Sequence, residues 1–195
     1  RDWSSDVCSS DLSLTLTNHI PLGFQLPYFN LPDTITGKMV SSDLVKGKKG
    51  TLVIFMCNHC PYVLHVIYEL VKIGSDFMNQ GIGIVAISSN DVGNYPEDHP
   101  SKMKELGLSL KFPFPYLYDE TQEVAKSYDA ACTPDFNLFN GQGKCVYRGQ
   151  LDDSRPGNGK PVTGRDLRTA LELVIKGIEV PIDQIPSSGC NIKWK

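Results

Sequence analysis

Two cysteines at the junction of a buried strand and an amphipathic helix constrain this fold more than any other feature. Residues 51–56 (TLVIFM) are continuously apolar, which is typical of a strand covered on both faces. Pro61 follows at a first helical position, and apolar residues then recur on one helix face from Val63 to Val71. A second apolar run, residues 82–88, predicts another buried strand. The order strand, helix, strand predicts a parallel crossover unit and an α/β protein.

Further elements indicate a mixed sheet with a hairpin on its N-terminal side. The pattern of residues 24–32 is typical of an extended chain. Residues 33–38 indicate a turn, and a short strand is expected around Met39, so the segment predicts this hairpin. The turn 140–144 (NGQGK) predicts a second, antiparallel hairpin. We therefore expect one domain over residues 13–195, with a central mixed sheet flanked by helices. The other expected elements are helices over 61–78, 99–106, 120–128 and 165–176 and strands over 116–118, 136–139 and 145–150.

Residues 1–12 (RDWSSDVCSSDL) differ from the rest of the chain. They are rich in Ser and Asp and have neither a helix nor a strand period. The string resembles the translation of a sequencing-library adapter, so we expect an artefactual or disordered extension in which Cys8 has no function. Five of the six cysteines then remain. An odd number does not suit a disulfide-stapled secreted scaffold and favours catalytic, metal-binding or buried thiols.

Composition excludes several classes of partner. The chain has a formal net charge of -3, and 41% of its residues are hydrophobic, enough for one core. This balance gives no broad basic field for phosphates or anionic lipid, so we expect neither nucleic acid nor a membrane surface as partner. No apolar run approaches the roughly 20 residues of a spanning helix, and the N-terminus has no signal-peptide pattern. We expect a cytoplasmic location.

The strongest chemical signal is the motif 57–61 (CNHCP). A cysteine at a helix N-terminus faces unpaired amides and the positive end of the helix dipole, which stabilise a thiolate. The two-residue spacing lets the second cysteine form a disulfide with the first. We assign Cys57 as the attacking thiol, because it is nearer to the helix tip, and Cys60 as the resolving thiol. His59 is expected to lower the pKa of Cys57 and to make the pair a better oxidant.

Metal binding is the main alternative for the same residues. Cys57, His59, Cys60 and His65 are all of zinc-ligand type. Structural zinc sites usually join one CxxC to a second ligand pair, and the sequence has no second CxxC. We therefore favour redox chemistry, without a metal or a cofactor, over a metal site or an inert buried pair.

The dipeptide Thr133-Pro134 precedes the first strand of the late hairpin. An antiparallel strand starts at the edge of the sheet where parallel strands end, so this dipeptide is expected to face Cys57. A cis peptide bond would turn the Thr133 backbone outward to pair with the extended chain of a substrate. A trans proline in an ordinary loop is the alternative.

Several strings resemble a known family. They are MCNHCPYV, SSNDVGNYPEDHP, ACTPDFNLF, YRGQLDDSRPGNGKPVTG and GCNIKWK, and their order is similar to that of the peroxiredoxin-like branch of the AhpC/TSA (redoxin) families in the thioredoxin superfamily. The resemblance covers nearly everything after Asn18. It implies the thioredoxin fold and a role in thiol redox homeostasis, with protein or small-molecule thiols and disulfides as partners. It names neither the substrate nor the reductant.

The chain departs from thioredoxin at two positions. Met56 replaces the Trp before the first cysteine, and the buried carboxylate of the preceding strand falls near Thr51, so the usual proton acceptor is missing. Asp91 follows the second strand at the same edge of the sheet and could substitute for it. An equally good interpretation is that Asp91 caps the next loop.

A thiol peroxidase is the alternative enzyme. Peroxiredoxins need a Pro-x-x-x-Thr/Ser-x-x-Cys loop and an arginine that polarises the peroxide. Ile54 stands three residues before Cys57, and Thr133 occupies roughly the place of the arginine. Arg148 and Arg155 are possible substitutes, although surface or loop contacts suit both better. A non-enzymatic metal-binding or chaperone-like module is the third hypothesis.

Three cysteines lie outside the motif. Cys132 precedes Thr133 and is placed to reach the pair, whereas Cys145 falls within a strand and is expected only to pack. Cys190 lies close to the C-terminal end, where chains are normally mobile. We expect its thiol to be a possible third redox partner of the pair.

Overall fold

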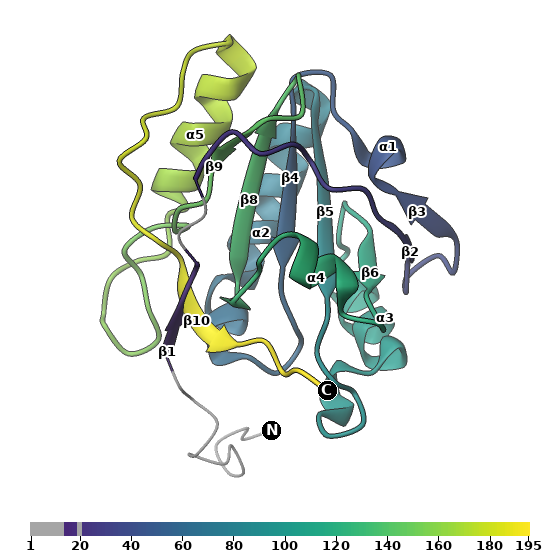
Figure 1. Cartoon of the computed structure of the whole chain (residues 1–195). Coiled ribbons are helices and arrows are strands. Elements are labelled where there is room, and N and C mark those ends of the chain that lie inside the picture. The colour runs from purple at the N-terminus through teal and green to yellow at the C-terminus, as the bar shows by residue number, and fades with distance from the viewer. Residues whose placement is uncertain (1–13, 19–20) are drawn as a thin grey trace.

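An apolar strand forms the centre of a five-stranded sheet in the computed structural model, which describes residues 14–18 and 21–195. β4 (Gly50–Phe55) is buried along its whole length. It pairs parallel with β5 (Ile82–Ser88) and antiparallel with β8 (Asp135–Asn140). β6 (Tyr116–Tyr118) and β9 (Cys145–Tyr147) complete the order β6-β5-β4-β8-β9 (Figure 1). The expected parallel crossover and mixed sheet are confirmed. The expectations for residues 1–12, Cys8 included, lie outside the described residues.

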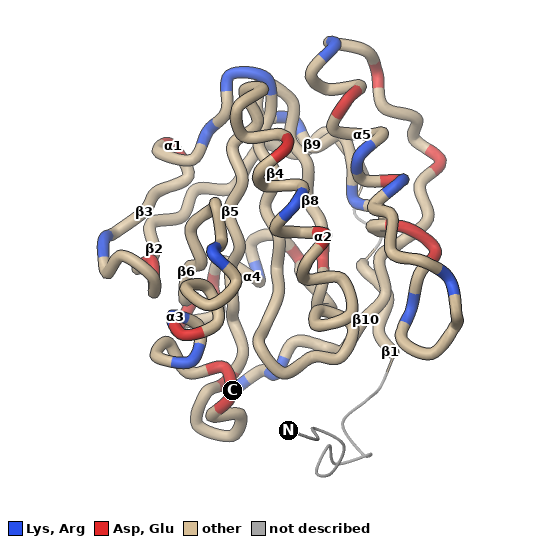
Figure 2. Tube along the Cα trace, turned by 180° about the vertical axis from the view of Figure 1, so that it is seen from behind, with Lys and Arg blue, Asp and Glu red and all other residues tan. Residues whose placement is uncertain are grey.

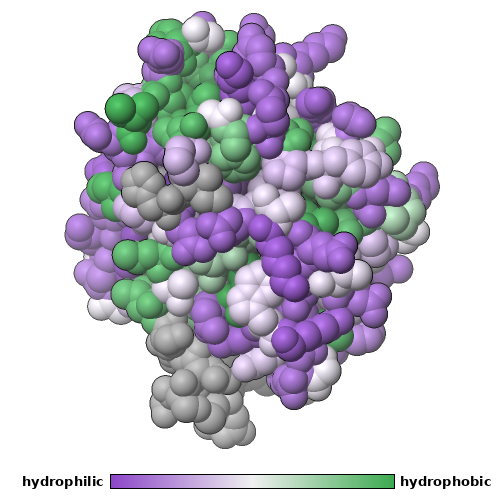
Figure 3. Space-filling view, viewed as in Figure 1, coloured by the Kyte–Doolittle hydropathy of each residue, from purple (hydrophilic) through white to green (hydrophobic). Residues whose placement is uncertain are grey.

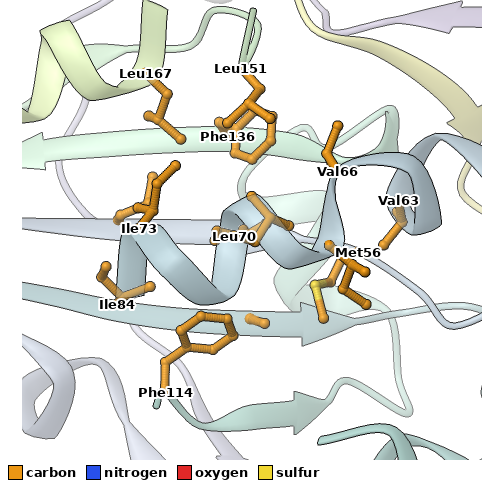
Figure 4. Packing of buried hydrophobic residues seen from close by; sticks show 14 of the residues in the cluster. Met56, Val63, Val66, Leu70, Ile73, Ile84, Phe114, Phe136, Leu151 and Leu167 are labelled. Carbon is orange, nitrogen blue, oxygen red and sulfur yellow. The ribbon is translucent and has the colours of Figure 1, made fainter. Parts of the chain in front are cut away.

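Alternate residues of β4 point into two hydrophobic clusters on opposite faces of the sheet. On one face, Leu52 and Ile54 pack with α2 (Pro61–Phe77) and α5 (Arg165–Lys176). Figure 4 shows Leu70 and other side chains of α2 packed over the strands of the sheet. This face holds the largest part of the core and fixes the start of α2 against the sheet edge.

The opposite face is covered by the N-terminal segment and α4 (Glu123–Ser127) (Figure 1). Val53 and Phe55 of β4 pack there with Phe29 and Tyr128. The expected N-terminal hairpin is confirmed as β2 (Asn30–Pro32) and β3 (Met39–Ser41), followed by α1 (Ser42–Val45). The other short elements are η1 (Met78–Gln80), η2 (Pro96–Asp98) and α3 (Pro100–Ser109).

Two predicted elements are shorter than expected. The helix over 120–128 begins only at Glu123, because Gln122 has left-handed backbone angles and Asp119 accepts a hydrogen bond from the Ala125 amide. The strand over 145–150 ends at Tyr147. Beyond it, Gly149 bridges to Pro186 in the C-terminal segment.

The C-terminal segment is a strand, contrary to the expectation of a mobile end. β10 (Ser188–Asn191) lies between β1 (Leu14–Leu16) and β7 (Cys132–Thr133) in a second, three-stranded antiparallel sheet. The string SGCN has no strand period, so only its tertiary partners show this strand. Figure 1 shows β10 crossing beside the lower end of β8.

The exterior carries charge of both signs. Figure 2 shows Lys and Arg interspersed with Asp and Glu around the trace, and the face in Figure 3 mixes hydrophilic and hydrophobic side chains. Within the described residues, no helix is long and apolar enough to cross a membrane.

Candidate active site

The two cysteines of the motif lie where β4 ends and α2 begins. Cys60 is the N-cap residue of α2, and Pro61 is its first residue. Both thiols are enclosed, with exposed fractions of 1% for Cys57 and 0% for Cys60. The Thr133–Pro134 peptide bond is cis. Thr133 Oγ1 lies 3.6 Å from Cys57 Sγ, so the expected juxtaposition is present.

The Thr133 backbone, however, does not face an open substrate position. Cys190 of β10 is its partner in the antiparallel register. A Cβ on Gly189 would lie 1.9 Å from the Thr133 carbonyl oxygen, so only glycine permits this close approach. The position expected to receive a substrate chain is therefore filled by the protein's own C-terminal strand.

The two thiols differ in their ionisation. Burial raises the pKa of Cys57, and the contact with Cys60 and the nearby Asp98 carboxylate raise it further. As a thiol, Cys60 donates to the Thr133 carbonyl oxygen at 3.2 Å. The neighbouring thiols of Cys190 and Cys57 can donate to a Cys60 thiolate, and they lower the pKa of Cys60. The pKa of Cys57 is thus raised and not lowered as predicted, because burial and the neighbouring Cys60 and Asp98 outweigh its place beside the start of α2.

His59 forms an ion pair with a buried carboxylate that the sequence analysis did not select. Its Nδ1 lies 2.7 Å from Oδ2 of Asp98, and its ring stacks on Tyr95 with centroids 5.5 Å apart. Burial opposes a charge on His59, but the Asp98 carboxylate outweighs burial, and the pKa of His59 is raised. The site thus places a histidine with a raised pKa beside Cys57.

Asp98, rather than Asp91, is the carboxylate of the site. It is fully buried, and it accepts hydrogen bonds from the Asn58 amide at 2.7 Å and from Asn90 Nδ2 at 2.8 Å. Asp91 accepts from the Gly93 amide and from Asn94, so it caps the loop, as the alternative interpretation held. The proposal of Asp91 as proton acceptor followed from its place directly after β5. The loop after β5 folds back and brings Asp98 to the same edge of the sheet, and the hydrophobic pattern of the sequence does not predict this turn.

The remaining cysteines separate into one that joins the pair and two that do not. Cys190 is buried, and its thiol interacts with the sulfur of Cys60. Cys132 faces away from the pair, because successive side chains of a strand point to opposite sides and Thr133 points toward Cys57. Its Sγ contacts Thr17 Oγ1 at 3.7 Å and Pro134 O at 3.6 Å. Cys145 packs in the core of the opposite face, as expected.

The two arginines considered for peroxide binding have other partners. Arg148 donates to the carbonyl oxygens of Tyr128 and Asp129. Arg155 donates to the side chains of Gln150 and Ser188. Neither arginine is among the groups that shift the pKa of Cys57.

The metal-ligand set differs from the one that the sequence suggested. One ligand atom from each of Cys57, His59 and Asp98 lies within 4.8 Å of the others. His65, one turn further along α2, lines a separate small cavity of about 20 Å³ beside Pro134. Three ligands of mixed type are the number that a catalytic zinc site uses.

Comparisons with known proteins agree with this architecture. Residues 22–149 match the AhpC/TSA family. An uncharacterized conserved protein from Geobacillus kaustophilus is 55% identical over 94% of this chain and 97% of its own, with a TM-score of 0.92. A hypothetical protein from Sinorhizobium meliloti is 45% identical over 93% and 98%, with a TM-score of 0.90.

A more distant similarity shows the fold. The thioredoxin domain of a thiol-disulfide oxidoreductase from Bacteroides vulgatus is 23% identical over 67% of this chain and 91% of its own, with a TM-score of 0.55. A search of curated proteins gave no match. The thioredoxin fold expected from the sequence is thereby confirmed.

Proposed function

The chain belongs to the AhpC/TSA family, and on this premise we propose that it is a thiol–disulfide oxidoreductase that acts through Cys57 and Cys60. Family and fold point to an oxidoreductase in general. The observation that carries the finer proposal is that Thr133 contacts the sulfurs of both cysteines at the start of a helix. This arrangement suits a pair that alternates between dithiol and disulfide.

The proposed reaction needs only the two thiols and a substrate disulfide. Cys57 sulfur attacks one substrate sulfur, the substrate S–S bond breaks, and the second substrate sulfur leaves as a thiolate. Cys60 then gives its proton to the substrate thiolate that has left, and its sulfur attacks Cys57 sulfur, which forms the Cys57–Cys60 disulfide and releases the first substrate sulfur. The pair is oxidised by two electrons and the substrate is reduced by two. The reverse sequence oxidises a dithiol substrate.

Cys60 supplies the base for the first step. Cys57 is among the groups that lower the pKa of Cys60, so we assign Cys60 as the group that takes the proton of Cys57 as Cys57 attacks. Cys57 is the thiol that reacts with substrate because it lies on the side of partly exposed His59, whereas Cys60 is covered by Thr133 and Cys190. The His59 imidazolium stabilises negative charge that develops on Cys57.

Peroxide reduction is supported less well by the same residues. It requires a positive group that polarises the peroxide next to the attacking sulfur, and both candidate arginines bind other acceptors. His59 lies beside Cys57, but it is paired with Asp98. Peroxide consumption that depends on Cys57 alone, and persists in a Cys60→Ser variant, would favour the peroxidase.

Zinc binding has one observation in its favour, the proximity of Cys57, His59 and Asp98. Zinc would hold Cys57 as a thiolate and block its attack on disulfides. Protein purified without chelators and analysed for metal separates the two functions. Stoichiometric zinc that is lost in a His59→Ala variant supports the metal site.

Trapping of substrates tests the proposed function. A Cys60→Ser variant exposed to disulfide substrates is expected to retain mixed disulfides on Cys57, because the resolving thiol is absent. A Cys57→Ser variant is the control and is expected to retain none at position 57. Equal trapping by both variants, or by neither, contradicts the assignment.

A further inference from the structure

The C-terminal strand β10 occupies the position that a substrate chain would take. Its register places Cys190 opposite Thr133, the residue that contacts both sulfurs of the pair. Gly189 makes this approach possible, since any side chain there would collide with the Thr133 carbonyl group. A cysteine thus lies where the cysteine of a bound substrate would be.

The Cys190 thiol interacts with Cys60 and not merely with the apolar core around it. The Cys60 sulfur lies against Thr133 O, and Thr133 is the register partner of Cys190. Cys190 is the largest of the groups that lower the pKa of Cys60, as expected for a neighbouring thiol that can donate to a Cys60 thiolate. The exposed fraction of Cys190 is 4%, so solvent does not separate the two groups. Cys57, Cys60 and Cys190, called the thiol cluster below, therefore form one continuous set in which Cys60 is the central member.

The segment after Cys190 is anchored to the site and holds the thiol in place. The Lys193 amide donates to Asn90 Oδ1 at 2.9 Å, and the Lys193 carbonyl accepts from the Asp91 amide at 2.8 Å. Asn90 also donates to Asp98. Because the same residues bind the tail and the active-site carboxylate, the position of Cys190 is coupled to the geometry of the pair.

We propose that Cys190 is a third redox thiol that exchanges disulfides with the active-site pair, so that β10 acts as an internal substrate. The proposal rests on the redox function of Cys57 and Cys60. In the exchange, Cys190 sulfur attacks Cys60 sulfur, the Cys60–Cys190 bond forms and the Cys57–Cys60 bond breaks. The proton of Cys190 passes to the departing Cys57 sulfur. No net oxidation occurs, and Cys57 is free to react again.

Oxidation of the pair itself prepares Cys190 for this step. In the reduced protein the pKa of Cys190 is raised, first by its hydrogen bond to Cys60, then by burial and by the charge of Cys60. In the Cys57–Cys60 disulfide, Cys60 carries no charge, so the first and third causes disappear. Lys193, which lowers the pKa of Cys190, remains. The thiol therefore becomes more nucleophilic when its target is present.

Peptide mapping can detect this exchange because trypsin places Cys190 in a different peptide from Cys57 and Cys60. Cys57 and Cys60 fall in residues 50–72, and Cys190 falls in residues 177–193. Cys132 and Cys145 fall in residues 127–144 and 145–148. The wild-type protein is oxidised with oxidised glutathione, its free thiols are alkylated in acid, and the non-reduced digest is analysed by mass spectrometry.

The decisive variant is Cys57→Ser. Diamide, a small oxidant that takes up the two thiol hydrogens, is expected to join Cys60 and Cys190 of this variant in a disulfide that links the peptides 50–72 and 177–193. The double variant Cys57→Ser, Cys190→Ser is the control and is expected to give no such link. A Cys57→Ser protein whose Cys60 and Cys190 both stay alkylatable, under conditions that form the Cys57–Cys60 disulfide in wild type, would overturn the proposal. Should the variant not fold, the wild-type digest decides between the same two outcomes: the cross-link supports the proposal, and its absence opposes it.

Displacement of the strand provides a second test that leaves every thiol in place. Gly189→Ala is expected to move β10 off Thr133 and to lower the yield of the cross-link by about tenfold or more, because disulfides tolerate only short separations. Cys145→Ser is the matched control and is expected to keep the wild-type yield. Equal yields in Gly189→Ala and wild type would contradict the role of β10.

The outcomes distinguish this proposal from the function on which it rests. The cross-link in Cys57→Ser is measured with diamide and requires no turnover of a substrate. A cross-link in protein whose Cys60→Ser variant traps no substrate would support the Cys190 assignment and oppose the oxidoreductase. If Cys60→Ser traps substrates on Cys57 but no Cys60–Cys190 cross-link forms, the oxidoreductase is supported and the Cys190 assignment is contradicted.

Discussion

The thiol cluster and Cys145 present the same functional group on opposite faces of one sheet, with opposite consequences. Cys57, Cys60 and Cys190 lie in the core cluster that contains α2, whereas Cys145 lies in the cluster under the N-terminal segment. In the thiol cluster, sulfur contacts oppose burial and lower the pKa of Cys60. At Cys145, burial dominates and raises the pKa to about 12.

The difference shows that burial alone does not decide the reactivity of a thiol. Cys60 is as buried as Cys145, but it is the N-cap residue of α2, and two neighbouring thiols, Cys57 and Cys190, lower its pKa. Cys145 lies within a strand, and its sulfur contacts the Tyr147 carbonyl at 3.7 Å. Reactivity here depends on donors that can stabilise a thiolate.

The largest effect is expected from removal of the attacking sulfur. Cys57→Ser should lower the rate of disulfide reduction by about a thousandfold or more, as removal of a catalytic nucleophile does in other enzymes. The measurement is the initial rate of reduction of a chromogenic disulfide at a fixed concentration of dithiol reductant. Cys145→Ser, the matched change on the other face, should keep the wild-type rate. Comparable losses in both variants would show that folding and not chemistry was affected.

A smaller effect is expected from removal of the charge beside Cys57. His59→Ala takes away an imidazolium that stabilises the reduced, anionic pair, so the pair should become more reducing by about 30 mV, toward the thioredoxin value of about -270 mV. Equilibration with glutathione buffers of known ratio measures this shift. A potential equal to that of wild type would exclude His59 from tuning the pair.

The same ion pair predicts how stability depends on pH. The pKa of His59 is raised in the folded state, so its contribution is fully present below the unfolded value of about 6.5 and is lost as pH rises through the folded value. We expect His59→Ala to lower the free energy of unfolding by about 1 kcal/mol at pH 5.5 and by less at pH 9. Urea unfolding under reducing conditions tests this, and a deficit that grows with pH would contradict it.

The smallest effect on chemistry is expected at Cys145. Cys145→Ser places a hydroxyl group in an apolar core and should cost about 1–2 kcal/mol of stability. Its alkylation in the native state should be slow in wild type, because the thiol is buried and its pKa is high. Labelling at neutral pH of the native and the urea-unfolded protein measures this protection, and equal rates of labelling at Cys145 in the two states would contradict it.

The sequence predicts the central fold well because local signals agree there. The apolar run of β4, the proline at the start of α2 and the apolar run of β5 each favour the element that forms. β10 has no such signal, since it is short and polar and its pairing depends on the contact of Gly189 with Thr133.

In the candidate site, too, the sequence predicts some residues and misses others. Cys57, Cys60 and Thr133 come together because strand ends meet at one edge of the sheet, which topology predicts. Asp98 could not be distinguished from Asp91, because both belong to the same connection and only the path of that loop decides which carboxylate turns inward. The orientation of Cys132 required the strand register.

A redox titration of the wild-type protein, with the state of every cysteine mapped at each potential, examines all the thiols in one sample. We predict a two-electron transition confined to the thiol cluster, with disulfides at Cys57–Cys60 and Cys60–Cys190, while Cys132 and Cys145 stay alkylatable as thiols throughout. A protein whose Cys57 and Cys60 form no disulfide at any potential up to that of oxidised glutathione would contradict the assignment of this pair as the redox centre.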